Sequence, residues 1–311
     1  MTTKIEQSVK NKTIAMIIPC YNEELTVAKV ITDTKKYLPE ANIYVIDNNS
    51  TDNTAKIAKE NGAEIIFEPR PGKGFAVQRA MERLDYDVYG MVDGDDTYSL
   101  ETIKDLVRPV MDGHYDMIIG SRLAIFENDS FRQFHVLGNR LVRGLINRLF
   151  RCKLTDIMSG YRIYNKEIAK KLPVVSKGFE VETEMTISLL SYGFRLKEID
   201  ICYKSRMKGS FSKLNTFKDG FKVLWTIFNL FKNNRPLTFF GTLALGFFFF
   251  SLIFGMVVVV DYFDDLFVEH VPLAILSTSL FLCGLLFFLV GVTLHSIVEK
   301  HNQVMCVLKK I

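Results

Sequence analysis

Two long stretches without a charged residue lie near the end of this 311-residue chain, at 237–260 and 272–294. Each stretch has the length that a helix needs to cross the hydrocarbon core of a bilayer, about 20 residues. Soluble proteins rarely bury helices that lack charges over so many positions. The two stretches therefore predict a pair of transmembrane helices, and a buried hairpin in a soluble core is the weaker interpretation.

The charges around these stretches predict their orientation. The connection at 261–271 carries acidic residues and neither lysine nor arginine, whereas the segments before the first stretch and after the second carry lysines and arginines. Basic residues remain on the cytoplasmic side of a membrane. We therefore expect a multi-pass protein of the cell (inner) membrane, with both chain ends in the cytoplasm and the acidic loop outside.

Two further segments combine apolar residues at helical spacing with lysines and arginines, at 214–236 and 134–150. Such a helix can lie in the headgroup plane of a membrane. It can also cover a soluble core and turn its basic side to solvent. The segment 214–236 directly precedes the first apolar stretch, so we expect an interfacial helix there. Both interpretations remain open for 134–150.

The rest of the composition excludes several classes. The net charge is only +4, and basic residues alternate with acidic ones, so no nucleic-acid partner is expected. The five cysteines are odd in number and form no CxxC pair, which indicates reduced thiols and no zinc site. The first 12 residues contain no apolar segment, so we expect no cleavable signal peptide.

The first half of the chain alternates between short apolar runs and amphipathic stretches. We expect strands at 13–19, 43–46, 65–67 and 88–92, and helices at 23–38, 51–61 and 74–84, the second of them capped by Ser50-Thr51-Asp52. This order predicts an α/β fold with a doubly wound, mostly parallel sheet. Ligands of such sheets bind at the carboxyl ends of the strands.

The fourth expected strand leads directly into Asp93-Gly94-Asp95. Carboxylates two positions apart on a strand point to the same side. Together they can hold one hard divalent cation, Mg²⁺ or Mn²⁺, and such an ion can bridge two phosphates of a nucleotide. Acidic turns are common, so this motif alone is more often a solvated turn than a metal site.

The other strand ends carry polar residues suited to a nucleotide. Asp47 can accept a hydrogen bond from a base or a ribose, and Arg70 and Lys73 can meet a diphosphate. Gly72 and Gly74 allow the backbone to approach a ligand closely. Neither GxGxxG nor a P-loop is present, which disfavours a dinucleotide oxidoreductase or a P-loop kinase. Together the strand ends predict a nucleotide-binding cleft.

Six motifs resemble those of family-2 glycosyltransferases with the GT-A fold: IPCYNEE (18–24), VIDNNSTDNT (45–54), PGKGFA (71–76), VDGDDTYS (92–99), GSR (120–122) and TDIMSGYR (155–162). The resemblance covers residues 13–235. The order of the motifs and the apolar tail are similar to those of polyprenyl-phosphate glycosyltransferases, which use dolichyl or undecaprenyl phosphate. The resemblance implies an enzyme that moves a sugar from a nucleotide-sugar donor to a lipid phosphate.

The resemblance and the strand ends together suggest roles for individual residues. The expected catalytic residues are Asp93, Asp95, Asp156 and Arg122, with Asp93 and Asp95 as the ligands of Mg²⁺ or Mn²⁺. The expected donor-binding residues are Pro19, Tyr21, Glu23, Asp47, Arg70, Lys73, Arg162, Arg206 and Ser212.

The chain departs from the family pattern at two places. Thr97 stands where many members have a glutamine that binds the metal. Asn48 and Asn49 replace the Asp-Gly that many members have at the second strand end. The third metal ligand and the identity of the nucleotide therefore stay open.

The expected acceptor is a lipid monophosphate, which is mostly a dianion at pH 7 and is therefore already a nucleophile. Such a reaction needs positioning and charge neutralisation rather than a general base. Lys213, Arg143 and Arg140 are the expected acceptor-binding residues, and Arg122 and Lys208 are further candidates. Glu182 is a weaker candidate for contact with the donor sugar.

The favoured reaction is transfer of a hexose or N-acetylhexosamine from a UDP-sugar to undecaprenyl phosphate, for cell-envelope glycans or lipids. Three alternatives are a processive polysaccharide synthase, a non-catalytic membrane scaffold and a soluble nucleotidyltransferase. The only tryptophan, Trp225, lacks the Gln-x-x-Arg-Trp context of processive synthases. GDP-mannose as donor and a homo-oligomeric state are left open.

The predicted order of domains follows from the resemblance and the apolar stretches. It is an N-terminal tail (1–12), a cytoplasmic GT-A catalytic domain (13–213), an interfacial helix (214–236), a first transmembrane helix (237–260), an external loop (261–271), a second transmembrane helix (272–294) and a cytoplasmic tail (295–311).

Overall fold

The computed structural model describes residues 12–126, 143–144, 146–148, 152–207, 216–265 and 267–308. The chain divides into two compact units, 1–227 and 228–311. Four residues with expected roles lie outside the described residues: Arg140, Lys208, Ser212 and Lys213.

The first unit is built on one seven-stranded sheet with the order β3-β2-β1-β4-β6-β5-β7. The strands are β1 (Ile14–Cys20), β2 (Asn42–Asp47), β3 (Glu64–Phe67), β4 (Val88–Met91), β5 (Met117–Phe126), β6 (Arg162–Asn165) and β7 (Leu196–Tyr203). Strand β6 runs antiparallel to β4 and β5, and the other strand pairs are parallel. The prediction of a mostly parallel α/β sheet is confirmed.

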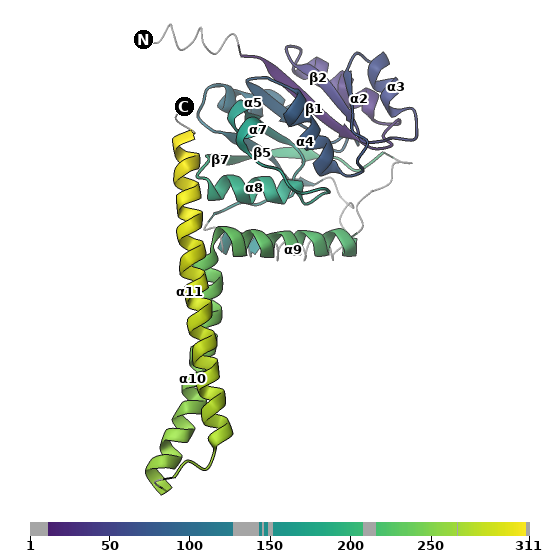
Figure 1. The fold of residues 1–311 in the computed structure, drawn as a ribbon. Coiled ribbons are helices and arrows are strands. Elements are labelled where there is room, and N and C mark those ends of the chain that lie inside the picture. The colour runs from purple at the N-terminus through teal and green to yellow at the C-terminus, as the bar shows by residue number, and fades with distance from the viewer. Residues whose placement is uncertain are drawn as a thin grey trace. The chain divides into compact units, whose positions relative to one another are not determined.

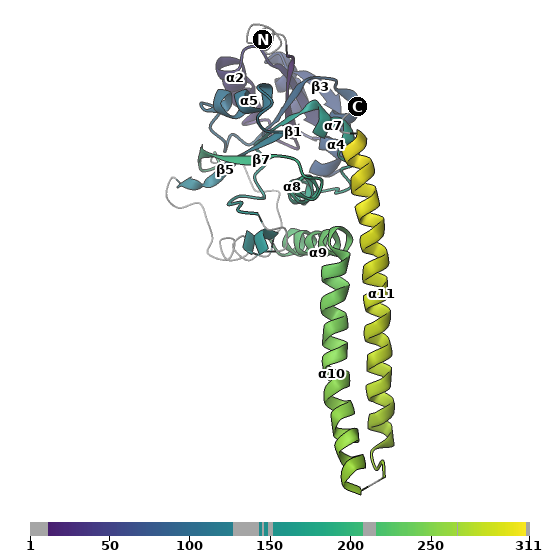
Figure 2. The same cartoon turned by 90° about the vertical axis from the view of Figure 1, so that its left-hand side faces the viewer.

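Helices cover both faces of the sheet (Figures 1 and 2). Alternate residues of β1 enter different cores, with Ile14, Met16 and Ile18 on one face and Ala15 and Ile17 on the other. A strand that is apolar on both faces belongs inside a covered sheet. One core contains α2 (Val27–Tyr37), α3 (Thr54–Glu60) and α5 (Ile103–Met111), and the other contains α4 (Lys73–Arg83), α7 (Lys166–Lys171) and α8 (Val181–Ser191).

Helices α2 and α3 begin a few residues later than expected. Asn22 has a left-handed φ of 53°, and the N–H of Val27 is the one that closes a helical turn onto the carbonyl of Glu23. In α3 the N–H of Thr54 donates to Asp52 Oδ1 at 2.9 Å, so the predicted cap residues belong to the preceding loop. The residues directly after β1 and β2 therefore form loops, and loops can approach a ligand.

Helix α9 (Thr216–Asn234) contains the boundary between the two units and confirms that the segment upstream of the first apolar stretch is helical. Val223 and Ile227 are buried, whereas the large side chains of Phe221, Leu224 and Trp225 are exposed. Exposed aromatic and aliphatic residues along one helix are typical of a surface that meets an apolar partner. The interfacial location stays a prediction.

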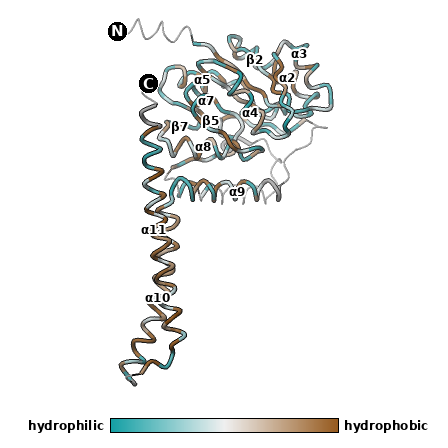
Figure 3. Tube along the Cα trace, viewed as in Figure 1, coloured by the Kyte–Doolittle hydropathy of each residue, from teal (hydrophilic) through white to brown (hydrophobic). Residues whose placement is uncertain are grey.

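The second unit contains a helical hairpin of α10 (Pro236–Asp265) and α11 (Val271–Leu308), which lie side by side (Figure 2). Both are long and apolar enough to cross a membrane, and most of their apolar residues face outward. Figure 3 shows mainly hydrophobic colouring along the hairpin, with hydrophilic colouring toward the C-terminal end of α11. Helix α11 continues past residue 294, so most of the expected tail is helical.

Small residues hold the hairpin together. The hydroxyl of Ser251 donates to the carbonyl of Ser277, and the hydroxyl of Ser277 donates to the carbonyl of Ser251, both at 2.9 Å. Gly284 lies so close to Phe248 that a Cβ would be 2.8 Å from the ring. Close approach at small residues and hydrogen bonds between helices are the usual means of association in lipid.

We predict that removal of residues 237–311 leaves the first unit folded, because both cores of its sheet lie within residues 14–201. Thermal unfolding of the truncated protein in mild detergent, followed by circular dichroism, should remain a single cooperative transition. Loss of that transition would show that the sheet depends on the helical hairpin.

Candidate active site

The candidate site lies where the strand order of the sheet reverses. The chain proceeds from β1 to β2 and β3 on one side, and β4 then pairs with the other side of β1. Crevices for ligands form at such reversal points, outside the carboxyl ends of the strands. The loops after β1 and β4 meet there, because Thr26 Oγ1 donates to the carbonyl of Gly94 at 2.6 Å.

Asp93 and Asp95 lie in the turn that follows β4, which ends at Met91. The turn is closed by Asp96, whose φ of 55° is left-handed. Asp95 is buried, and its Oδ1 accepts hydrogen bonds from the hydroxyl of Thr97 at 2.6 Å and from its N–H at 3.3 Å. Burial raises the pKa of Asp95, and the negative charge of Asp93 adds to the rise.

Two basic side chains neutralise this pair. The ammonium of Lys73 contacts Asp93 and also lies 2.5 Å from a carboxylate oxygen of Glu182, at the start of α8. Arg206 Nη2 lies 2.5 Å from Asp95 Oδ2. Burial alone lowers the pKa of Lys73, but Asp93 and Glu182 outweigh it and hold the pKa well above its usual value. Lys73 is therefore a permanent cation.

Gly160 provides the room for this cluster. A Cβ on Gly160 would lie 2.7 and 2.8 Å from the two carboxylate oxygens of Asp93 and 2.8 Å from Lys73 Nζ. Its N–H donates to the hydroxyl of Tyr98 at 2.9 Å, which fixes the backbone beside the pair. Any larger residue at this position would displace the carboxylate or the ammonium.

Arg122 and Asp156, both expected to be catalytic, form a bidentate pair. Arg122 Nε and Nη2 donate to the Asp156 oxygens at 2.7 and 2.8 Å, and the Asp156 side chain is fully buried. Burial raises the pKa of Asp156, but the charge of Arg122 outweighs this effect and lowers the pKa. Glu198 accepts the N–H groups of Thr155 and Asp156 and so fixes the loop. Asp156 thus positions Arg122.

The structure does not bring Arg162 to the mouth of the crevice. Its side chain is fully buried, and its guanidinium donates to the carbonyls of Ile157 and Ser159 at 2.6 and 2.8 Å and to Thr186 at 2.9 Å. The donor contact expected for Arg162 is therefore revised. Its hydrogen bonds hold the turn that leads to Gly160.

Asn48, one of the departures from the family pattern, ties two strand ends together. Its Oδ1 accepts the N–H of Gly72 at 2.7 Å, and its Nδ2 donates to the carbonyl of Arg70 at 2.7 Å. The Arg70 side chain itself is held by Glu68 at 2.7 and 3.0 Å and lies 4.4 Å over the ring of Phe75. Asn48 therefore fixes the loop that carries Lys73.

The expected base-binding residues differ in exposure. Tyr21 is 44% exposed, whereas Glu23 and Asp47 are buried. Asp47 Oδ1 accepts the N–H of Ser50 at 3.1 Å, which closes the turn after β2. Pro19 lies within β1, paired with Ile46 of β2. Arg143, an expected acceptor residue, is described as part of a short helical segment and is partly buried.

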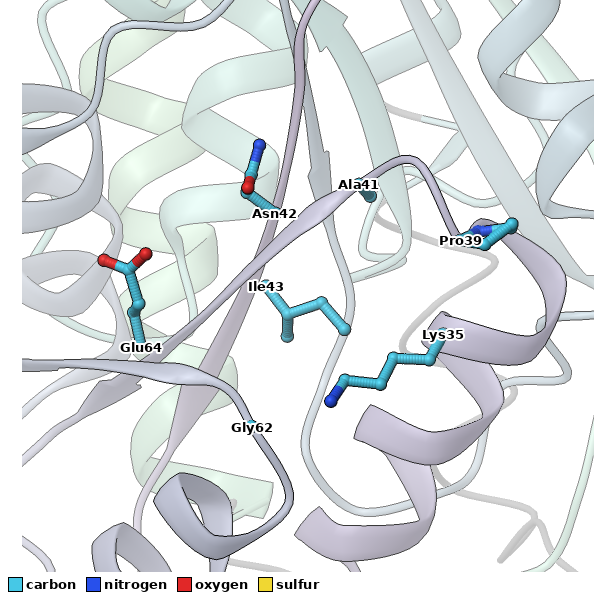
Figure 4. Close-up of a pocket in the computed structure, with 7 residues that line it drawn as sticks. All are labelled: Lys35, Pro39, Ala41, Asn42, Ile43, Gly62 and Glu64. Atoms are coloured by element: carbon cyan, nitrogen blue, oxygen red, sulfur yellow. The ribbon is translucent and has the colours of Figure 1, made fainter.

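A separate pocket lies at the opposite, amino-terminal ends of the strands (Figure 4). Its lining includes Asn42 and Glu64, the first residues of β2 and β3, together with Lys35 and Gly62. It is therefore at the amino ends of strands whose carboxyl ends carry Asp47 and the Arg70 loop. Lys35 Nζ donates to the carbonyl of Asn61 at 2.7 Å, so this cation is engaged by the backbone.

The residues present suit a hard divalent cation. Asp93 and Asp95 offer carboxylate oxygens, the ligands that Mg²⁺ and Mn²⁺ prefer. Within the described residues, no group of three or more histidine, cysteine, aspartate or glutamate side chains is arranged to enclose a metal. Thr97 donates to Asp95 and so orients it. Asp93 and Asp95 are thus the residues that would hold such an ion.

Comparison with known proteins identifies the family. Residues 15–173 match glycosyl transferase family 2. Over 296 residues the chain is 30% identical to glycosyltransferase AglJ of Haloferax volcanii, covering 94% of this chain and 96% of that protein. It is also 27% identical over 207 residues to a dolichyl-phosphate hexose transferase of the same organism, covering 67% and 89%. The chain belongs to glycosyl transferase family 2 and is a glycosyltransferase.

Solved structures confirm the GT-A fold. The glucosyl-3-phosphoglycerate synthase of Mycobacterium tuberculosis, solved with Mn²⁺, UDP-glucose and phosphoglyceric acid, matches with a TM-score of 0.59 at 21% identity, covering 74% of this chain and 84% of that one. Its complex with Mg²⁺ and UDP matches with a TM-score of 0.59. At this identity the likeness establishes the arrangement of the sheet and helices.

We predict that Gly160→Ala lowers kcat/KM for glycosyl transfer by about 100-fold, because the new methyl group displaces the Asp93 carboxylate by a large part of an ångström. Thermal stability should change little, since the displaced atoms are the ends of flexible side chains. Gly220→Ala is the matched control, because a Cβ there meets no atom within 4 Å. Wild-type kinetics for Gly160→Ala would contradict the close packing around Asp93.

Proposed function

We propose that the protein transfers a hexose or N-acetylhexosamine from a UDP-sugar to a polyprenyl phosphate, with undecaprenyl phosphate as the expected lipid. The observation that carries this proposal is the pair Asp93 and Asp95 at the reversal point of the sheet, in a chain that also has two helices apolar enough to cross a membrane. The similarity to a dolichyl-phosphate hexose transferase supports a lipid phosphate as acceptor.

In the proposed reaction the charges of the site neutralise the departing diphosphate. Asp93 and Asp95 would hold Mg²⁺ or Mn²⁺, which supplies Lewis-acid stabilisation of the leaving group. Arg206 and Lys73 already lie at the two carboxylates and bring positive charge to the same place. Such preorganised charges act without reorganisation during the reaction.

The acceptor phosphate needs alignment more than activation. A phosphate monoester is largely a dianion at neutral pH, so no base has to remove a proton from it. Arg122, fixed by Asp156 and lying 5.6 Å from the ring centre of Tyr203, is a rigid cation that can orient such a dianion. We assign Arg122 to phosphate alignment and Asp156 to its positioning.

The proposed membrane arrangement gives the acceptor access to this site. The catalytic domain at 13–213 and both chain ends would lie in the cytoplasm, α10 and α11 would cross the membrane, and α9 would lie in the headgroup plane. The exposed Phe221, Leu224 and Trp225 of α9 support this location. A polyprenyl phosphate presents its charge at the same depth, where Arg140, Arg143 and Lys213 are the proposed contacts.

The substrates can be identified with a panel of UDP- and GDP-sugars and short-chain polyprenyl phosphates, with products read by mass spectrometry. We expect a lipid-phosphate sugar from a UDP-sugar, formed in the presence of Mg²⁺ or Mn²⁺ and abolished by EDTA. Transfer from GDP-sugars alone would show that the donor nucleotide is GDP and not UDP. Transfer to a soluble acceptor but to no lipid would overturn the proposed acceptor.

We predict that Asp95→Asn reduces kcat by about 100-fold or more, because the loss of one carboxylate leaves the diphosphate charge uncompensated, a cost of about 3 kcal/mol. Asp96→Asn is the matched control one residue away. Asp96 pairs with Lys29 at 3.0 Å, and asparagine tolerates the left-handed φ at this position. Retention of more than about a tenth of the activity by Asp95→Asn at saturating metal would contradict the metal assignment.

We predict that Lys213→Glu and Arg143→Glu lower turnover of a short-chain acceptor even in neutral detergent, because the reversed charge repels the acceptor dianion. A residue that only contacts anionic lipid, worth about 1 kcal/mol, should matter only in anionic membranes. The rates are therefore compared in detergent and in anionic liposomes. If both variants show normal kinetics in detergent, the acceptor role is contradicted and only contact with anionic lipid remains for these residues.

A further inference from the structure

Lys73 is shared between two carboxylates that come from different parts of the chain. Its ammonium contacts Asp93, in the turn after β4, and lies 2.5 Å from Glu182 Oε1, in the first turn of α8. The side chain of Lys73 is 10% exposed and that of Glu182 only 4%. Removal of either partner of a buried ion pair is costly, so this group of three charges is a built feature of the site.

The loop that carries Lys73 is packed against the segment leading to α8. The N–H of Gly74 donates to the carbonyl of Lys177 at 3.0 Å. A Cβ on Gly72 or Gly74 would collide with the carbonyl oxygens of Lys177 and Ser176. Glu184 in turn accepts the N–H of Ser176 at 2.8 Å. Lys73 and Glu182 therefore belong to one rigid assembly, whereas Asp93 comes from the neighbouring turn.

One carboxylate would be enough to balance Lys73, and here there are two. If Asp93 is to bind a divalent cation, its oxygen must leave the ammonium, because two cations cannot share one ligand position without repulsion. An ammonium left alone in this buried place would be strongly destabilised. Glu182 prevents that, because its contact with Lys73 does not depend on Asp93.

We propose that Lys73 is the resident counter-ion of Asp93 and that Glu182 is a positioning residue that retains Lys73 when a divalent cation takes its place; this proposal rests on the proposed function. Lys73, once released from Asp93, has N–H donors that can meet a diphosphate while Glu182 holds the ammonium in place. Asp95 must also give up its contact with Arg206 if it binds the metal, so Arg206 can turn toward the diphosphate in the same way.

The exchange of partners couples the binding of metal and nucleotide. Metal alone must displace Lys73 from Asp93 and Arg206 from Asp95, and so takes one anionic contact from each cation. Metal together with a nucleoside diphosphate supplies a new anion at once. Each ligand therefore strengthens binding of the other by the same factor. We expect Mn²⁺ to bind about tenfold more tightly in the presence of UDP, within the range usual for coupled sites.

The test measures Mn²⁺ affinity of the full-length protein in detergent, with and without UDP, from the electron paramagnetic resonance signal of free Mn²⁺. Lys73→Met should tighten binding of Mn²⁺ alone by about tenfold and reduce the coupling to UDP, because the competing cation is gone. Glu182→Gln should weaken Mn²⁺ binding by about tenfold, because the ammonium then has only Asp93.

The double variant Lys73→Met/Glu182→Gln separates a Lys73-dependent effect from a simple loss of negative charge. In the Lys73→Met background, Glu182→Gln should change Mn²⁺ affinity much less than in the wild type. Lys166→Met is the matched control, since Lys166 pairs with Asp85 at the surface and should leave Mn²⁺ binding unchanged. Glu182→Asp, which keeps the charge but withdraws it, should give an intermediate affinity and guards against misfolding of the glutamine variant.

The proposal would be overturned if Glu182→Gln changed Mn²⁺ affinity equally in the wild type and in the Lys73→Met background. It would also be overturned if Glu182→Gln bound Mn²⁺ with wild-type affinity. So would Mn²⁺ binding that is independent of UDP. These outcomes leave the proposed function intact, because metal and nucleotide still bind. If the wild type binds neither Mn²⁺ nor UDP, even together, the proposed function fails, and this inference fails with it.

Discussion

Repulsion between Asp93 and Asp95 is the constraint to which the rest of the catalytic unit is adapted. Two carboxylates in a partly buried turn are stabilised by nearby cations, and each one has its own: Lys73 for Asp93 and Arg206 for Asp95. These cations come from α4 and from the segment after β7, which are remote in sequence. The negative charge of the turn after β4 thus requires that α4 and the segment after β7 both come close to it.

A second layer of polar contacts holds the charged residues in place. Asn48 fixes the loop before α4, Thr97 orients Asp95, and Asp156 clamps Arg122. None of these contacts requires a ligand, so the site is formed in advance. Preorganisation of this kind lowers the cost of binding, because few side chains have to be ordered when the substrate arrives.

The sequence predicted what depends on local pattern. Short apolar runs gave the first four strands, and long uncharged runs gave the two helices of the hairpin. It did not predict the antiparallel insertion of β6 or the burial of Arg162, because both depend on contacts between distant segments, such as the hydrogen bond from Arg162 to Thr186 of α8. Glu182 was ambiguous for the same reason: three glutamates follow one another at 180–184, and only the fold shows which one faces Lys73. Gly160, in the SGYR motif, is a crowded position that the sequence itself could have indicated, because a glycine within a motif often marks a place with no room for a side chain.

In the proposed membrane arrangement, the length of α11 has a mechanical consequence. At 1.5 Å per residue, its 38 residues make a rod about 57 Å long. A hydrocarbon core is only about 30 Å thick. The excess can be taken up by tilting, by a thicker bilayer or by helix outside the lipid, and each adjustment has a small energetic cost. The hairpin, locked by its two serines, would have to tilt as one body. In that arrangement, bilayer thickness would act on this enzyme through the angle of a rigid rod.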